Sequence, residues 1–248
     1  MLVLSSRRIF WIFFLVAILL YLLDLGIYFG HWIQYRKLRD LFNITLEANI
    51  PTWFSSLQFM VTGLVAWIIS RQRATMGQSG AALVWVWIAL FFLFDGLDDT
   101  AQIHERLGSY FGHLARTYGP VWSTMETLRH FPSYYWLLCV APFFIGFGLF
   151  MTGFLYREFS ATHLRIIFLS AMVCYASAMA LDYIEGASHL DIFVEQTSLN
   201  SKQMQHIFQS TEELIEMLGT ALVLGTFLEY LRFLQGKAAC RLEMCLIA

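Results

Sequence analysis

The sequence predicts an all-α, polytopic integral membrane protein with six transmembrane helices in one bundle. Hydrophobic residues make up 58% of the 248 residues and charged residues only 14%, whereas soluble domains average about 25% charged residues. The apolar residues are gathered into six long runs. The alternating pattern of a membrane β-barrel is absent, so helices are expected to satisfy the backbone within the bilayer.

The six runs have close to the ~20 residues that a helix needs to cross ~30 Å of hydrocarbon. They span residues 9–32, 53–70, 81–97, 134–156, 164–184 and 214–234. The first has the basic start of a signal peptide, but it is too long and lacks a small-x-small cleavage site, which predicts a retained anchor. The third is short, and it spans the bilayer only if Asp95 is drawn toward the interface or into the bundle.

The chain is expected to form a single domain, because the six runs use most of its length. We expect a partly helical outer loop near residues 98–133, with its helix at about 100–117. A second outer loop is expected at 186–209.

Lysine and arginine residues predict that both termini are cytoplasmic. With the N-terminus inside, nine basic residues fall in short inner segments, whereas the other seven are spread through longer outer loops. The nine are Arg7, Arg8, Arg71, Arg73, Arg157, Arg165, Arg232, Lys237 and Arg241. Arg36, Lys37 and Arg39, directly after the first run, are the contrary evidence.

Acidic residues gather where the outer ends of the runs enter hydrocarbon. All of the eighteen except Glu158, Glu229 and Glu243 lie toward the outer side of this topology. Uncompensated carboxylates are costly in lipid, so intramembrane ones mark candidate functional sites. Polar residues in five of the six runs share this level, which predicts one polar chamber under the outer loops, on the periplasmic or extracellular side.

Helical spacing identifies candidate metal ligands in this chamber. Asp182, Glu185 and His189 stand at i, i+3 and i+7 on one helical face. Unpaired, such carboxylates would repel one another, and a cation would relieve the repulsion. The full candidate set is Asp98, Asp99, His104, Glu105, Asp182, Glu185, His189, Glu213 and Glu216. Nine residues are too many for one ion, so some are expected to orient ligands rather than to bind.

Structural interpretations compete with these roles. Ser210 and Glu213 fit a capping box at the start of the last run, while Glu216 lies one turn deeper. A stripe of Asp95, Asp98, Gln102 and Glu105 requires the third helix to continue through Gly96, which could also break it.

Other polar residues are expected to have surface or structural roles. His113, His130 and His206 are expected at the loop surface, and His31 at the membrane interface. Asp24 is expected to pair with an arginine or a serine hydroxyl inside the bundle.

Carboxylate and imidazole groups on facing helices are typical of iron, manganese or zinc sites, and an oxygen-rich ligand set also suits calcium. The His-Glu-x-x-His motif of zinc proteases is absent, because Gly108 occupies the position of the second histidine after His104-Glu105. The sequence therefore predicts a divalent metal ion without selecting one of the four.

The leading functional hypothesis is a metal-binding membrane protein. If it is catalytic, it is expected to be a metal-dependent enzyme that acts on a lipid or another membrane-resident substrate. The alternative is an accessory or assembly subunit of a larger membrane complex, because no catalytic signature is present. A cation- or proton-coupled transporter is the third, disfavoured because inverted repeats are not detected. The expected partners are the lipid bilayer and membrane-protein subunits; a net charge of −2 and the absence of a phosphate loop argue against nucleic acid.

Overall fold

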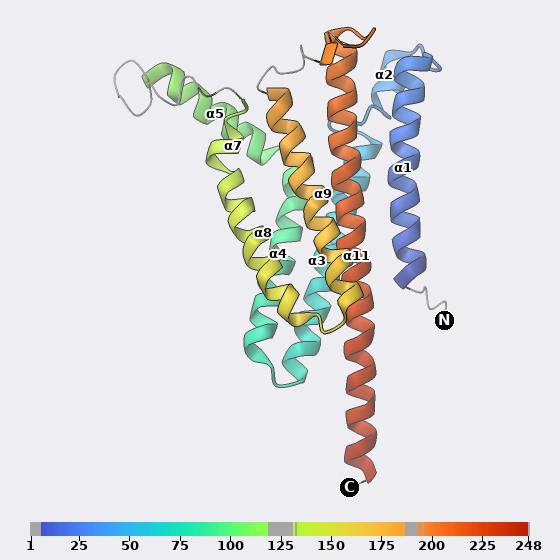
Figure 1. The fold of residues 1–248 in the computed structure, drawn as a ribbon, viewed down its shortest axis with the longest axis vertical. Helices are drawn as coiled ribbons and strands as arrows, with labels where there is room; N and C mark the ends of the chain where they lie inside the picture. Colours follow the sequence, from blue (N-terminus) through green and yellow to red (C-terminus); the bar gives the residue numbers. More distant parts are fainter. Residues whose placement is uncertain (1–5, 119–130, 132, 187–192, 195, 248) are drawn as a thin grey trace.

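The computed structural model describes residues 6–118, 131, 133–186, 193–194 and 196–247, and over this part of the chain it contains helices and no strands. Figure 1 shows the helices arranged as a bundle. They are α1 (Ser6–Gly30), α2 (Arg36–Asp40), α3 (Ile50–Thr75), α4 (Ser79–Ala101), α5 (Ile103–Tyr118), α7 (Trp136–Cys139), α8 (Ala141–Glu158), α9 (Thr162–Gly186) and α11 (Ser201–Ile247).

Within the described part of the chain, five helices are long and apolar enough to cross a bilayer, namely α1, α3, α4, α9 and the Ser201–Gly236 part of α11. They correspond to five of the six predicted runs. The remaining run, 134–156, is divided at Val140 into α7 and α8. Pro142 stands in the first turn of α8, where its missing N–H costs no hydrogen bond and where it favours a new helix start. Arg157 and Glu158 make the far end of α8 less apolar, and this helix is not among the five.

Helices α3 and α4 form a hairpin around residues 76–78, where Gly77 has a φ of 77°, and they share the most extensive interface of the bundle. Their backbones approach closely at two glycines. A Cβ on Gly63 would lie 2.9 Å from the carbonyl oxygen of Ala89, and one on Gly96 would lie 3.0 Å from that of Ser56. Gly96 therefore packs α4 against α3 and does not break the helix.

Helix α11 packs against α9, α1 and α3 (Figure 1). It starts at Ser201, well before the predicted position 214, so the capping box at Ser210 and Glu213 is wrong. Ser210 lies inside the helix, where its hydroxyl donates to the His206 carbonyl at 2.6 Å. The helix is capped by Asn200, whose side chain accepts from the Gln203 N–H at 3.0 Å, while the Gln203 side chain accepts from the Asn200 N–H.

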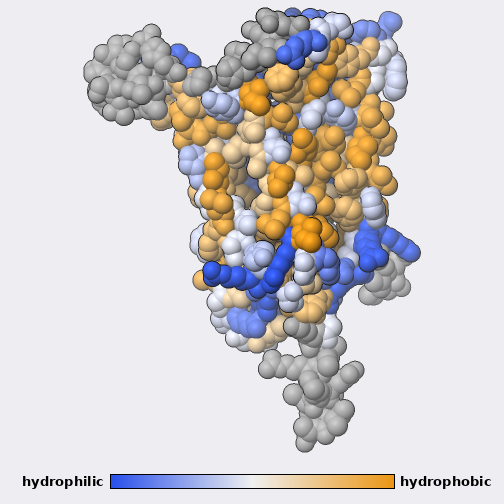
Figure 2. Space-filling view, in the orientation of Figure 1, coloured by the Kyte–Doolittle hydropathy of each residue, from blue (hydrophilic) through white to orange (hydrophobic). Residues whose placement is uncertain are grey.

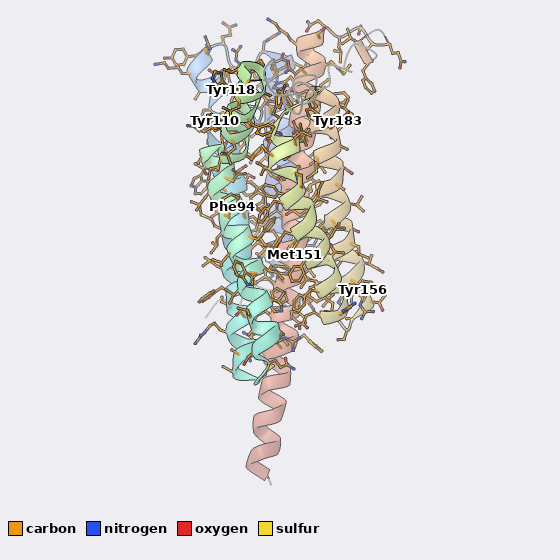
Figure 3. All side chains as sticks on the ribbon, turned by 90° about the vertical axis from the view of Figure 1, so that its left-hand side faces the viewer. Phe94, Tyr110, Tyr118, Met151, Tyr156 and Tyr183 are labelled. Atoms are coloured by element: carbon orange, nitrogen blue, oxygen red, sulfur yellow. The ribbon has the colours of Figure 1, made fainter. Side chains whose placement is uncertain are left out.

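The two ends of the bundle differ in composition. The start of α1, the end of α11 and the α3–α4 and α8–α9 turns lie at one end, here the terminus-bearing end; α2, α5 and α7 lie at the other, here the α5 end (Figure 1). Figure 2 shows hydrophobic side chains over the middle of the visible face and hydrophilic ones toward both ends. Figure 3 places Tyr156 near the first end and Tyr110, Tyr118 and Tyr183 near the second, as expected for interfacial aromatic residues.

The apolar core fills the half of the bundle nearer the terminus-bearing end, where Trp85, Phe92 and Phe227 are fully buried together. At its edge, Glu158 pairs with Arg73 and accepts from the Tyr230 hydroxyl at 2.9 Å. Arg73 therefore supplies the positive charge that Glu158 needs in this partly buried position.

Candidate metal centre

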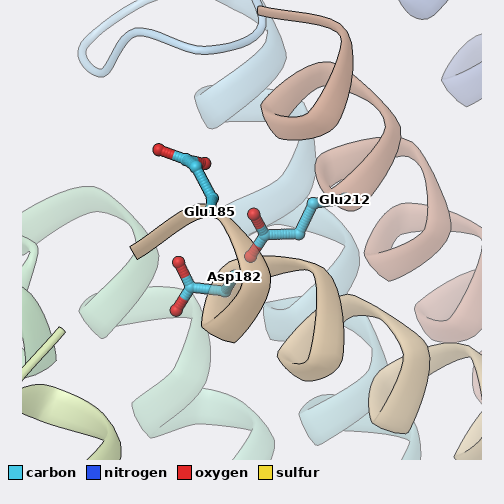
Figure 4. A group of neighbouring side chains, drawn as sticks. All are labelled: Asp182, Glu185 and Glu212. Atoms are coloured by element: carbon cyan, nitrogen blue, oxygen red, sulfur yellow. The ribbon is translucent and has the colours of Figure 1, made fainter. Parts of the chain in front are cut away.

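Three carboxylates from two helices converge near the α5 end. Asp182 and Glu185 stand one turn apart at the end of α9, and Glu212 faces them from α11, which packs along α9. One oxygen from each lies within 4.8 Å of one oxygen from each of the others. Figure 4 shows Glu212 extending from α11 toward the end of α9, where Asp182 and Glu185 lie. Asp182 and Glu185 are only 9% and 7% exposed, so water does little to screen their charges.

Glu185 is held by three hydrogen bonds to the same oxygen. Its Oε1 accepts from the Tyr134 hydroxyl at 2.6 Å and from the side-chain amides of Gln209 at 2.8 Å and Gln205 at 3.1 Å. These donors come from the segment before α7 and from α11, so the carboxylate is fixed from two sides. Its other oxygen accepts no hydrogen bond from the described residues.

Asp182 has an oxygen without a partner. The side chain of Trp136 on α7 lies near the carboxylate, yet Oδ2 is buried and meets no hydrogen-bond donor among the described residues. A buried carboxylate oxygen without a donor is costly. It therefore marks a position where a cation or a proton would be strongly stabilised.

Asp98 holds His104 by two contacts. The backbone N–H of His104 donates to Asp98 Oδ1 at 2.8 Å, and its Nδ1 lies 2.5 Å from Oδ2. Burial lowers the pKa of His104, but the hydrogen bond and charge of Asp98, together with the charges of Glu105 and Glu216, outweigh burial, so the net shift is upward. The pairing fixes the imidazole ring and leaves Nε2 for another partner, which is how carboxylates orient metal-binding histidines.

Further carboxylates from α4 and α11 surround this group. Glu216 interacts electrostatically with Asp99, His104 and Asp182, and Asp95 interacts with Glu216. The Ser56 hydroxyl of α3 donates to Asp99 Oδ2 at 2.7 Å. Side chains from α3, α4, α5, α9 and α11 thus meet at one level of the bundle.

Glu47 joins the same region from the loop before α3. Its Oε2 is buried without a partner among the described residues. Burial, followed by the charges of Asp99 and Glu105, raises the pKa of Glu47 to about 7. A carboxyl group from a loop therefore faces the acidic ends of α4 and α5.

These acidic residues form what we call the carboxylate cluster. It comprises Glu47, Asp95, Asp98, Asp99, Asp182, Glu185, Glu212, Glu213 and Glu216. Among the described residues, His104 is the one basic side chain among their strongest electrostatic partners. Nine carboxyl groups and one imidazole cannot all be ionised in a poorly solvated bundle, so the cluster must hold protons or metal cations.

The structure distributes the predicted ligands over different positions. Asp182 and Glu185 stand in the converging triad, while Asp98, Asp99, His104, Glu213 and Glu216 surround it. Glu105 is exposed, with a 3.4 Å hydrogen bond from Gln102, and His189 lies outside the described residues. The predicted stripe through Asp95, Asp98, Gln102 and Glu105 is interrupted, because Gln102 has a φ of 54° and ends α4.

Three members of the carboxylate cluster were missing from the predicted ligand set. Asp95 was considered only as part of the stripe on the third helix. Glu212 was assigned to the start of a helix, although its four-residue spacing from Glu216 indicates a shared face. Glu47 carries no pattern that distinguishes it from other loop residues. Only the folding of the 31–49 loop against α4 and α5 reveals it.

The structure also tests the surface and structural roles expected for the other polar residues. His206 is not a surface residue: it is 5% exposed within α11, with Nε2 2.9 Å from Asp24 Oδ2. Asp24 pairs with a serine as expected, accepting from the Ser210 hydroxyl at 2.9 Å. His31 and His113 are exposed, and His130 lies outside the described residues.

The sequence profile of one protein family matches residues 11–230, and that family is described as a domain of unknown function (DUF8692). The match includes every residue of the carboxylate cluster. No curated protein and no solved structure matches the chain.

Proposed function

This chain belongs to the DUF8692 family, and we propose that it is an integral membrane protein that binds a divalent metal ion through Asp182, Glu185 and Glu212. The observation that carries the proposal is the convergence of these carboxylates, whose oxygens lie within 4.8 Å of one another. An ion that binds oxygen at roughly 2.0–2.6 Å can be shared by atoms at such separations.

Electrostatics supports a cation at this position. The three carboxylates lie close together, and Oδ2 of Asp182 has no donor among the described residues. Repulsion between like charges grows as the surroundings become less polar. A divalent ion would turn this repulsion into attraction and give Asp182 its missing partner.

The chemistry of the donor atoms limits which metal ions fit the site. Three carboxylates form an all-oxygen set, which favours calcium or manganese over zinc. Iron and zinc become more favourable if His104 adds a nitrogen ligand. In that arrangement Asp98 is the residue that orients the imidazole, not itself a ligand.

As an enzyme, the protein would use this metal site to act on a lipid or another membrane-resident substrate. A bound metal supplies an activated water molecule. Glu216 and His104, close to the triad, are the groups that would accept and return protons. Glu213 and Asp99 would sustain the negative field around them.

We further propose that α8 is a sixth span and that both termini are cytoplasmic, which places the carboxylate cluster on the outer side. Met151 and Leu155 of α8 are buried in the same core as the spanning helices, which supports the sixth span. Arg71, Arg157 and Arg165 near the terminus-bearing end support the orientation.

Metal analysis of the full-length protein, purified without chelator, tests the proposal. We expect a stoichiometric divalent metal in the wild type and less than about a tenth of it in Asp182→Asn and Glu212→Gln, since losing one ligand or the partner that orients it typically lowers metal affinity by about 10–100-fold. Glu105→Gln is the matched control, because this exposed carboxylate lies nearby but outside the triad, and it should keep the metal.

Thermal unfolding of the same variants separates the alternatives. Loss of metal with a folded protein supports the metal site. A wild type without metal, together with variants that only unfold at lower temperature, would contradict it and favour an accessory subunit held together by buried polar contacts.

A further inference from the structure

We propose that the depression between α1, α2 and the start of α11 binds the phosphate of an anionic phospholipid headgroup. This cavity has a volume of about 310 Å³. Arg39 of α2 and Lys202 of α11 line it, together with Tyr28 and His31 at the end of α1. The site lies at the α5 end but apart from the carboxylate cluster, and it does not depend on the metal proposal.

The charge of the cavity fits a phosphate. Arg39 shares one carboxylate, Asp40, with Arg36, at 3.8 and 3.5 Å. The α2 segment Arg36–Asp40 therefore retains an excess of positive charge, with Lys37 adding to it. Lys202 forms no ion pair with any other described residue. Two cations from different helices thus border one cavity, an arrangement that suits a phosphate group.

The position of the cavity identifies a lipid as the source of the phosphate. The cavity lies where the spanning helices α1 and α11 meet the α5 end. Trp32 and Tyr35, which lie in the chain between the lining residues His31 and Arg39, are 68% and 67% exposed. Exposed tryptophan and tyrosine at the end of a spanning helix are typical of the headgroup region of a bilayer.

The fold fixes the tryptophan at this level. The chain reverses at His31, which has a φ of 50°. The indole of Trp32 then lies against α1, so close that a Cβ on Gly26 or Gly30 would come within 2.6 and 2.5 Å of the ring. Glycine at these two positions is what allows the ring to stay on the helix edge rather than in solution.

An apolar depression on the same end of α1 suits an acyl chain. It has a volume of about 210 Å³ and is lined by apolar side chains that include Leu23, Ile27 and Phe42. A soluble phosphate would use only the basic cavity. A phospholipid would use basic and apolar surfaces of this one helix end.

Native mass spectrometry of the full-length protein in detergent tests the proposal, with phosphatidylglycerol and phosphatidylcholine of identical acyl chains as probes. We expect the wild type to retain phosphatidylglycerol preferentially. The double variant Arg39→Gln, Lys202→Gln should lose that preference, by roughly fivefold for each cation removed. The control Lys37→Gln, matched to the single variant Lys202→Gln, removes a neighbouring charge that does not line the cavity. It leaves Asp40 shared between Arg36 and Arg39 and should keep the preference for phosphatidylglycerol.

Equal binding of the two lipids to the wild type would overturn the proposal, as would an equal loss of preference in the control. Inorganic phosphate distinguishes the source: if millimolar phosphate displaces phosphatidylglycerol, the site takes a free anion and the lipid assignment is wrong. Arg39 and Lys202 are not buried, so the variants should fold. The single variant Lys202→Gln supplies a second test, in which the preference for phosphatidylglycerol should fall about fivefold.

Discussion

At the scale of single residues, two buried carboxylates show how context decides the role of an acid. Asp24 is 2% exposed and accepts three hydrogen bonds, from His206, Ser210 and the Ile44 N–H. Asp182 is nearly as buried but keeps one oxygen without a donor. The first residue is satisfied by the protein and serves its structure, whereas the second requires a ligand.

We expect Asp24→Ala to reduce stability strongly, because it leaves His206 and Ser210 buried without their partner. Breaking a buried pair costs roughly 3–5 kcal/mol, whereas Ser210→Ala removes one neutral donor and should cost about 1 kcal/mol. Thermal unfolding in detergent measures both, with exposed His113→Ala as the control. Equal effects of the two substitutions would show that Asp24 does not hold α1 against α11.

Glu47 predicts a pH dependence whose sign follows from its environment. Its pKa is about 7 in the folded protein and 4.5 in the unfolded chain, so the stability from the buried acid is complete below pH 4.5 and lost as the pH rises to 7. Above pH 7, Glu47→Gln should therefore have a free energy of unfolding roughly 1–3 kcal/mol higher than that of the wild type. Unfolding curves in chelator check this; a gain that persists below pH 4.5 would contradict it.

At the scale of the helix, glycines divide into packing sites and open sites. The α3–α4 interface depends on close approach at Gly63 and Gly96. In α8, by contrast, a Cβ on Gly146, Gly148 or Gly153 would meet no atom of the described residues within 4 Å. Glycine therefore permits close packing between α3 and α4, whereas in α8 it only lowers the stability of the helix.

Matched glycine substitutions should have opposite effects. Gly63→Ala places a methyl group 2.9 Å from the Ala89 carbonyl oxygen and should destabilise the protein by roughly 1–3 kcal/mol. Gly153→Ala meets open space and should stabilise α8 by about 0.5–1 kcal/mol. Unfolding temperatures of the two variants decide the matter, and a fall in both would show that α8 also packs closely there.

At the scale of the whole molecule, the fold places residues 76–78 and the α5 helix at opposite ends of the bundle (Figure 1). In a variant without native cysteines, Gln78→Cys and Ser109→Cys should react with a membrane-impermeant thiol reagent from opposite sides. Both positions are exposed. Modification of Gln78→Cys from the outer side of intact cells would contradict the proposed orientation.

The long apolar helices follow from the sequence, because hydrophobic length is a local property that each run carries by itself. Five helices that are long and apolar enough to cross a bilayer were predicted close to their places in the described part of the chain, and the acidic residues lie together near one end of the bundle, as their positions in the runs predicted. The start of α11 was misplaced, since Ser210 and Glu213 imitate a cap. The true cap at Asn200 and Gln203 uses the same chemistry ten residues earlier.

The site shows the same division. The three-residue spacing of Asp182 and Glu185 predicted that they lie close together, because both stand on one face of α9. The third member, Glu212, required the packing of α11 along α9, and the burial of His206 required the packing of α11 against α1. Sequence alone thus determined the helices, their apolar length and the level of the acidic groups. Only the tertiary structure decided which carboxylates meet, since contacts between helices depend on rotation and register that no single helix encodes.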